Sequence, residues 1–225
     1  MLIDLLFPKK CLGCTKEGKY LCQSCIGKQI LAKQVCIECE KASIDGITHF
    51  KCQKKLGLSG AVSAWKYEGV VRKVLISLKY RFAQETASEL AKYCSDFLKA
   101  NITALPKDAI LVPVPLHKSR ENWRGFNQSE EIGKLVASQM KWKFIPDFVL
   151  RKVKTTPQTE LSEKERKQNL RTAFVFNQKH LPLIASGLSL IIFDDVATTG
   201  STLKEVGKVL KRNGFKNVWG LTVAR

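Results

Sequence analysis

One segment sets the architecture of this chain: Leu190-Ile-Ile-Phe-Asp-Asp-Val-Ala-Thr-Thr-Gly-Ser-Thr-Leu203. An apolar run typical of a buried strand leads into two carboxylates, and a hydroxyl-rich loop then leads into a helix. The start of a helix favours a phosphate group, because it offers unpaired backbone N–H groups and the positive end of the helix dipole. Loop hydroxyls add donors, glycine permits close backbone approach, and the carboxylates offer hard oxygen acceptors to ribose hydroxyls or Mg²⁺. We therefore expect a site for a phosphorylated sugar, made of Asp194, Asp195, Ala197, Thr198, Thr199, Gly200, Ser201 and Thr202.

Two other interpretations of this segment are open. The first is an ordinary strand-to-helix turn without a ligand. The second is the phosphate loop of a nucleotide triphosphatase, which also joins a strand to a helix. That loop needs a Gly-Lys pair before Ser or Thr, whereas Gly200 is followed directly by Ser201, so the pattern disfavours it.

The segment resembles the phosphoribosyl-pyrophosphate (PRPP) signature of type I phosphoribosyltransferases, and the chain as a whole resembles the ComF family of competence-associated proteins. Three further segments carry the resemblance, which covers nearly the whole chain. They are the cysteine-rich start, Arg124-Gly-Phe-Asn-Gln128, and residues 158–174 with Arg166, Asn169, Ala173 and Phe174. The resemblance implies an α/β fold with a parallel sheet of the type I phosphoribosyltransferase kind, preceded by a small zinc-ribbon module.

The length and the charge of the chain limit the classes of protein to which it could belong. At 225 residues the chain can hold one substantial domain and a small one. Its net charge of +18 favours polyanions such as nucleic acid, an anionic membrane surface or a pyrophosphate-bearing substrate. A lysine-rich host proteome is the alternative explanation, because no dense basic run marks a groove. No apolar run approaches the roughly 20 residues of a membrane span, and Asp4 interrupts the apolar start, so we expect a cytoplasmic protein.

The cysteines point to metal. Seven of the eight precede residue 53, and six of these form Cys-x-x-Cys pairs, a spacing typical of zinc knuckles. We expect a module over residues 1–58 that holds one or two structural zinc ions, since so short a segment needs metal to fold. The expected ligands are Cys11, Cys14, Cys22, Cys25, Cys36, Cys39, His49 and Cys52. By default, consecutive knuckles share one zinc ion, but a cross-braced arrangement, in which the first knuckle pairs with the third, stays open. His49 is either a ligand or a surface histidine.

The remainder, residues 59–225, is expected to form the phosphoribosyltransferase-like domain. Strand and helix patterns alternate there, which implies a parallel sheet with helices on both faces and ligands at the carboxyl ends of its strands. We expect strands at 61–67, 110–116, 148–153, 190–194 and 217–224, and helices at 69–79, 85–100, from about 129, and at 202–212. Asn127 is expected to cap the helix from about 129.

By the resemblance, the loop after strand 110–116 would hold pyrophosphate. Arg124 is the first candidate, followed by Lys118 and Arg120, because a guanidinium can engage two phosphate oxygens at once. The alternative to a pyrophosphate-binding role is that Arg124 is an exposed charge beside the start of a helix. Residues 152–171 resemble the family's mobile loop, which would close over PRPP, and residues 79–81 resemble part of an active-site hood.

The resemblance also implies a function. It implies that the protein binds PRPP or ribose 5-phosphate with Mg²⁺. It also implies that the protein acts in DNA uptake, natural competence or the handling of incoming DNA. Single-stranded DNA and competence proteins such as a DNA helicase or translocase are the expected partners, through which the protein could associate with a membrane. A metabolic phosphoribosyltransferase with a structural zinc module and a PRPP sensor without turnover are the alternatives. The sequence identifies no catalytic group and no acceptor, so pentosyl transfer stays an open question.

Overall fold

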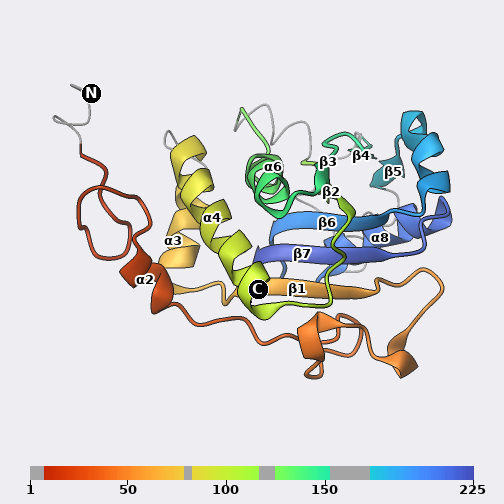
Figure 1. Cartoon of the computed structure of the whole chain (residues 1–225), viewed down its shortest axis with the longest axis horizontal. Helices are drawn as coiled ribbons and strands as arrows, with labels where there is room; N and C mark the ends of the chain where they lie inside the picture. Colours follow the sequence, from red (N-terminus) through yellow and green to blue (C-terminus); the bar gives the residue numbers. More distant parts are fainter. Residues whose placement is uncertain (1–7, 79–82, 117–124, 153–172) are drawn as a thin grey trace, which may run out of the picture.

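A five-stranded parallel sheet forms the centre of the computed structural model, which describes residues 8–78, 83–116, 125–152 and 173–225. The strand order is β1-β7-β6-β2-β3, and Figure 1 shows β6 and β7 in the middle. The strands are β1 (Gly60–Trp65), β2 (Ala109–Pro113), β3 (Lys143–Phe144), β6 (Ser189–Val196) and β7 (Val218–Ala224). This confirms the expected α/β class with a parallel sheet.

Strand β6 is apolar throughout its first half because both of its faces are covered. Leu190 and Ile192 are fully buried in the core on one face of the sheet. Ile191 and Phe193 are fully buried in the core on the other face. Strands of a parallel sheet that are buried on both sides have continuous apolar runs rather than alternation, which explains why this strand stands out in the sequence.

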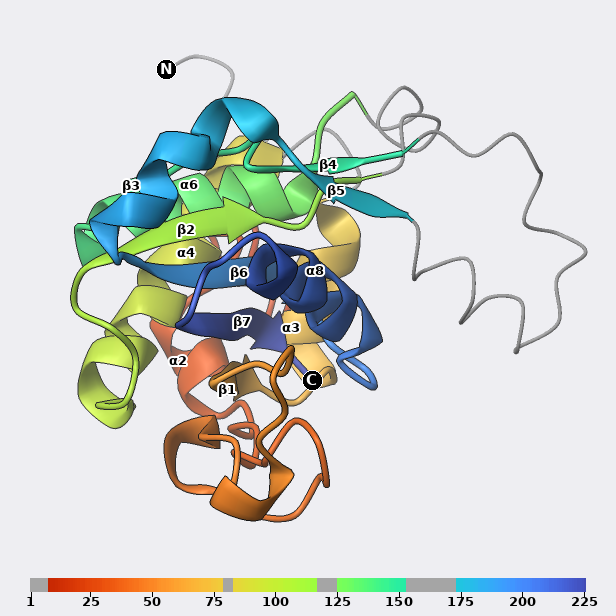
Figure 2. The same cartoon turned by 90° about the vertical axis from the view of Figure 1, so that its right-hand side faces the viewer.

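Helices cover both faces of the sheet, as expected (Figure 2). Residues of α3 (Gly69–Ser77), α4 (Ala83–Asn101) and α6 (Gln128–Met140) build the core on one face. Helix α8 (Ser201–Arg212) lies on the opposite face. Leu203, Val206 and Leu210 of α8 recur at helical spacing and are all buried, which holds the helix against β6 and β7.

One expected strand pairs outside the parallel sheet. Strand β4 (Val149–Arg151) runs antiparallel to β5 (Phe174–Phe176) in a separate two-stranded sheet, so the expectation of uninterrupted parallel alternation is wrong here. The physical reason is an aromatic cluster beside α8. The rings of Phe148, Phe176 and Phe215 pack with centroids 5.3–5.6 Å apart. The 3-10 segment η4 (Gln178–Ser186), which the sequence pattern did not indicate, follows β5.

The cysteine-rich segment lies along the β1 edge of the sheet (Figure 1). Its regular elements are short, namely α2 (Gln23–Gly27), η1 (Ile44–Gly46) and η2 (Phe50–Cys52). Gly46 has φ 69° and approaches β1 so closely that a Cβ atom would lie 1.9 Å from the carbonyl oxygen of Ala61. The carboxylate of Asp45 accepts hydrogen bonds from the backbone N–H groups of Thr103 and Ala104, at 2.7 and 3.0 Å. These contacts dock the segment onto the α/β domain.

No helix in the part of the chain that the structure describes is long and apolar enough to span a bilayer.

Candidate functional site

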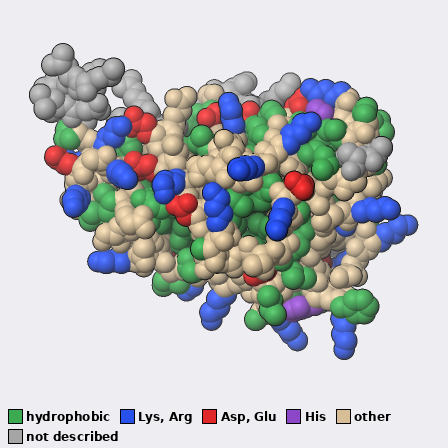
Figure 3. All heavy atoms as spheres, viewed as in Figure 1, with side chains coloured by type: hydrophobic (Ala, Val, Ile, Leu, Met, Phe, Trp, Pro, Cys, Tyr) green, Lys and Arg blue, Asp and Glu red, His purple; other side chains and the backbone are tan. Residues whose placement is uncertain are grey.

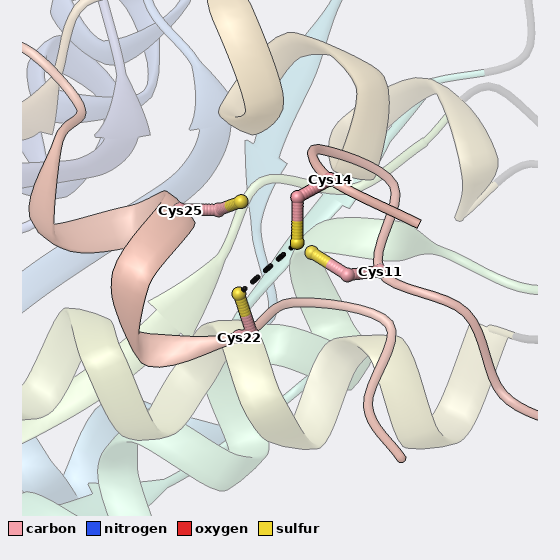
Figure 4. Close-up of side chains that lie close together, drawn as sticks. All are labelled: Cys11, Cys14, Cys22 and Cys25. Carbon is pink, nitrogen blue, oxygen red and sulfur yellow. Dashed lines mark hydrogen bonds between the residues drawn. The ribbon is translucent and has the colours of Figure 1, made fainter. Parts of the chain in front are cut away.

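The first two cysteine knuckles converge on one point. The Sγ atoms of Cys11, Cys14, Cys22 and Cys25 all lie within 4.8 Å of one another, and Figure 4 shows the four side chains turned inward. Cys22 and Cys25 are held by α2, which begins directly after Cys22. Four sulfur ligands at these separations suit a tetrahedral zinc ion.

The backbone around this first cluster favours the thiolate of Cys11. The N–H of Gly13 donates to Cys11 Sγ at 3.4 Å. Burial opposes ionisation of Cys11, but hydrogen bonds from the backbone of Cys22, Cys14 and Gly13 outweigh it and lower its pKa to about 6. A Cβ atom at Gly13 would lie 2.6 Å from Cys25 Sγ, so only glycine fits inside this knuckle. Such backbone donors hold zinc-binding thiolates in place.

The second cluster joins Cys36, Cys39, His49 and Cys52, whose ligand atoms also lie within 4.8 Å of one another. His49 Nδ1 is 3.3 Å from Cys39 Sγ, whereas its Nε2 is 3.0 Å from the carbonyl oxygen of Ala42. A carbonyl can only accept, so this contact places the proton on Nε2 and leaves Nδ1 free for a metal. The clusters follow the consecutive pairing of knuckles, and His49 lies with the cysteines. Both groups of residues could hold zinc.

The acidic pair lies at the carboxyl end of β6, where ligands bind in parallel sheets. Asp194 Oδ1 accepts hydrogen bonds from the Ser129 hydroxyl at 2.8 Å and from the Asp195 N–H at 3.0 Å. Burial, together with the negative charge of Asp195, raises the pKa of Asp194 to about 8. Asp194 is therefore largely protonated at neutral pH, and a bound cation would release the proton.

The loop after the acidic pair ends at Gly200, which is the N-cap of α8 and has φ 68°. Gly200 supplies no side-chain acceptor to the first turn. The Ser201 N–H donates to Thr199 Oγ1 at 3.4 Å, and the next two N–H groups of the turn have no partner within the helix, so a ligand or water can accept from them. Thr198, Thr199 and Ser201 are exposed beside the helix start. The predicted residues 194–202 thus bring carboxylates, hydroxyls and helix-end N–H groups together between the end of β6 and the start of α8.

Ser129 is part of this site, and the sequence analysis missed it. It occupies the first turn of α6, behind the expected N-cap Asn127, whose side chain accepts from the Ser129 N–H at 3.1 Å. Asn127 also donates to the carbonyl oxygen of Val114, at 3.0 Å, just past the end of β2. A serine in a first helical turn looks like a capping residue in the sequence, so only the fold reveals its contact with Asp194.

Proteins related to this chain extend over most of its length, although no family model matches it. The DNA utilization protein YhgH of Escherichia coli K12 is 31% identical over 209 residues, which are 89% of this chain and 89% of the relative. The chain belongs to the ComF family. Among its ComF relatives, Competence protein F of Haemophilus influenzae is 38% identical over 120 residues, 51% of this chain and 50% of the relative. Competence protein ComFC of Bacillus subtilis is 26% identical over 211 residues, 92% of this chain and 79% of the relative.

Several predicted ComF residues lie outside the described part of the chain. They are the pyrophosphate candidates Lys118, Arg120 and Arg124, the hood residues 79–81, and residues 153–171 of the expected mobile loop, with Arg166 and Asn169. Ala173 and Phe174 are described and buried in the core on the α8 side. The loop after β2 starts beside the acidic pair, because the N–H of Val114 donates to the carbonyl oxygen of Phe193 at 2.8 Å.

Proposed function

We propose that this ComF protein acts in DNA uptake or in the handling of incoming DNA, and that residues 194–202 bind PRPP or ribose 5-phosphate with Mg²⁺. The names of the relatives, DNA utilization protein and competence protein, support the first part. The carboxylates, hydroxyls and helix-end N–H groups gathered at the end of β6 support the second. Residues 1–58 would form the zinc-binding module and residues 59–225 the phosphoribosyltransferase-like domain.

The observation that carries the ligand proposal is the junction at Gly200. The phosphate would accept from the N–H groups of the first turn of α8 and from the hydroxyls around it. Asp194 and Asp195 would accept from ribose hydroxyls, and Mg²⁺ would neutralise the charge that the two carboxylates share with the ligand. Arg124, Lys118 and Arg120 are proposed to hold the pyrophosphate.

Calorimetric titration with PRPP tests this assignment, with and without Mg²⁺. We expect Mg²⁺-dependent binding that Asp195→Asn weakens and Gly200→Val abolishes. Gly187→Val is a matched control, because Gly187 has φ 67° but no atom within 4 Å of its Cβ position. Unchanged binding by both site variants would exclude residues 194–202. Pyrophosphate release that depends on an added acceptor would identify an enzyme rather than a sensor.

Nucleic acid is the proposed macromolecular partner, single-stranded DNA in particular. Positive side chains spread over the face seen in Figure 3 and project from its lower edge, where the second cysteine cluster lies. In that module Phe50 is 87% exposed, and Lys51, Lys54 and Lys55 are exposed nearby in the sequence. An exposed aromatic ring among cations is suited to stack on a base beside neutralised phosphates.

A titration of labelled single-stranded DNA tests this partner. Binding should depend weakly on sequence and fall steeply with salt, as counterion release requires. Phe50→Ala should weaken it, whereas Ile44→Ala should not, since Ile44 is an exposed aliphatic residue of the same module. Absence of binding at low salt would leave the charge of +18 without a role in DNA handling.

A further inference from the structure

The second cysteine cluster and the candidate phosphate loop meet in one packing contact. Ile37 lies inside the knuckle between Cys36 and Cys39, and only 4% of it is exposed. A Cβ atom built on Gly200 would lie 3.1 Å from Ile37 Cδ1 and 3.2 Å from its Cγ1. The Ile37 side chain therefore occupies the space in front of the glycine at which α8 begins.

The same side chain reaches into the core beneath the loop. Ile37 belongs to the buried cluster that contains Leu203 and Val206 of α8, and Ala197 of the loop packs against this cluster. Protein interiors are densely packed, so a shift of the knuckle must displace the groups that it touches. Both neighbours of the loop, the knuckle and α8, thus contribute to its position.

The first cysteine cluster has different neighbours. The N–H of Leu21 donates to Glu89 of α4 at 2.6 Å, and a Cβ atom at Gly13 would lie 3.2 Å from Val70 of α3. This cluster therefore rests on the opposite helical layer. It serves as an internal control, because it is built from similar ligands but has no such contact with the phosphate loop among the described residues.

A weaker contact lies beside the packing contact. Arg225 Nη2 is 3.5 Å from Oε1 of Glu40, which directly follows Cys39 of the second cluster, and Arg225 follows the carboxyl end of β7. Ala197 of the loop donates its N–H to the carbonyl oxygen of Ala224 at 3.0 Å. The pair is partly exposed and contributes little by itself, so Ile37 is the principal contact.

We propose that Ile37 is a positioning residue for the phosphate loop, and that metal in the second cluster, rather than in the first, sets the loop's affinity for a phosphorylated sugar. This inference rests on the proposed function of residues 194–202. The coupling is reciprocal, because two binding equilibria that share one element must influence each other equally. Bound PRPP therefore raises the affinity of the second cluster for its metal.

Calorimetry on the zinc-loaded full chain tests the first half of the inference. Ile37→Ala should weaken PRPP binding by about tenfold, within the usual range of coupling between sites, while zinc content stays unchanged. Ile44→Ala is the matched control, since Ile44 is 83% exposed in the same module, and its affinity should equal that of the wild type. Ile37→Val, which removes Cδ1 but keeps Cγ1, should fall between the two.

Zinc release tests the second half. At equilibrium with a competing chromogenic chelator, PRPP should raise the amount of zinc that the second cluster of a Cys14→Ser variant retains, and Ile37→Ala should remove this protection. PRPP should have no such effect in a Cys39→Ser variant, which retains the first cluster. Failure of the wild type to bind PRPP would overturn the proposed function and this inference with it. Normal wild-type binding that Ile37→Ala leaves unchanged, with zinc release insensitive to PRPP, would overturn the inference alone.

Discussion

The hydroxyl of Ser129 donates a hydrogen bond to Asp194 Oδ1 at 2.8 Å, and so connects the first turn of α6 with the acidic pair at the end of β6. The two residues are 65 positions apart in the sequence. Through this bond the helix on one face of the sheet fixes the orientation of a carboxyl group at the carboxyl end of the central strands. The acidic pair is therefore held in place before any ligand arrives.

Ser129→Ala should destabilise the fold, because it removes a donor from a largely desolvated carboxylate. A cost of about 1 kcal/mol corresponds to a fall in Tm of roughly 2–4 °C for a chain of this length. Thermal unfolding measures the change. Ser138→Ala, on the exposed side of α6, is the control and should leave Tm within about 1 °C of the wild type. Equal Tm values for the two variants would argue against an energetic role for the bond.

Asp194→Asn should raise stability at alkaline pH. Burial and the charge of Asp195 raise the pKa of Asp194 to about 8 in the folded chain, whereas an unfolded aspartate titrates near pH 4. Between these values the folded state binds more protons than the unfolded state, so this group makes stability fall as pH rises from about 4 to 8. A gain of about 2 kcal/mol at pH 8 would raise Tm by roughly 4–8 °C, and the gain should vanish near pH 4.

The pH profile of unfolding without ligand checks this prediction. Asp96→Asn, at an exposed position of α4 paired with Lys92, serves as the control and should keep the wild-type profile. Parallel profiles for Asp194→Asn and the wild type from pH 5 to 8 would show that Asp194 carries its charge in the folded state at neutral pH.

Gly13→Ala should disable one metal cluster and spare the other. The new methyl carbon would lie 2.6 Å from Cys25 Sγ, which is too close for both atoms. Cys25 would therefore have to leave the position from which it can bind the metal. Zinc content should fall from about two ions per chain to about one, because the second cluster has its own ligands. Gly27→Ala is the control, as no atom lies within 4 Å of its Cβ position. Full zinc content in Gly13→Ala, or less than about one zinc in the wild type, would contradict the assignment.

Local patterns were sufficient to predict much of this architecture. The strand β6 and the helix after it are visible because their apolar residues, acidic pair and glycine are consecutive. The knuckle spacing likewise indicates the two cysteine clusters, since each pair of ligands is only three residues apart. Such features depend on neighbours along the chain, which a sequence displays directly.

Contacts between distant segments could not be predicted in the same way. The Ser129–Asp194 bond, the packing of Ile37 on Gly200 and the antiparallel pairing of β4 with β5 each join separate elements. A serine in a helix start and an isoleucine in a zinc knuckle have ordinary local explanations. Their contribution to the site appears only when the sheet brings the elements together.

Hydrogen exchange with and without PRPP and Mg²⁺ tests the central claim most directly, because it locates the ligand without any substitution. The account predicts that the backbone N–H groups of residues 199–203 exchange more slowly with ligand, since a phosphate bound at the start of α8 would accept hydrogen bonds from this segment. Those at the far end of α8, around residues 209–212, should change much less. Protection elsewhere in the chain, with residues 199–203 exchanging at the same rate in both states, would contradict the assignment of this loop as the phosphate site.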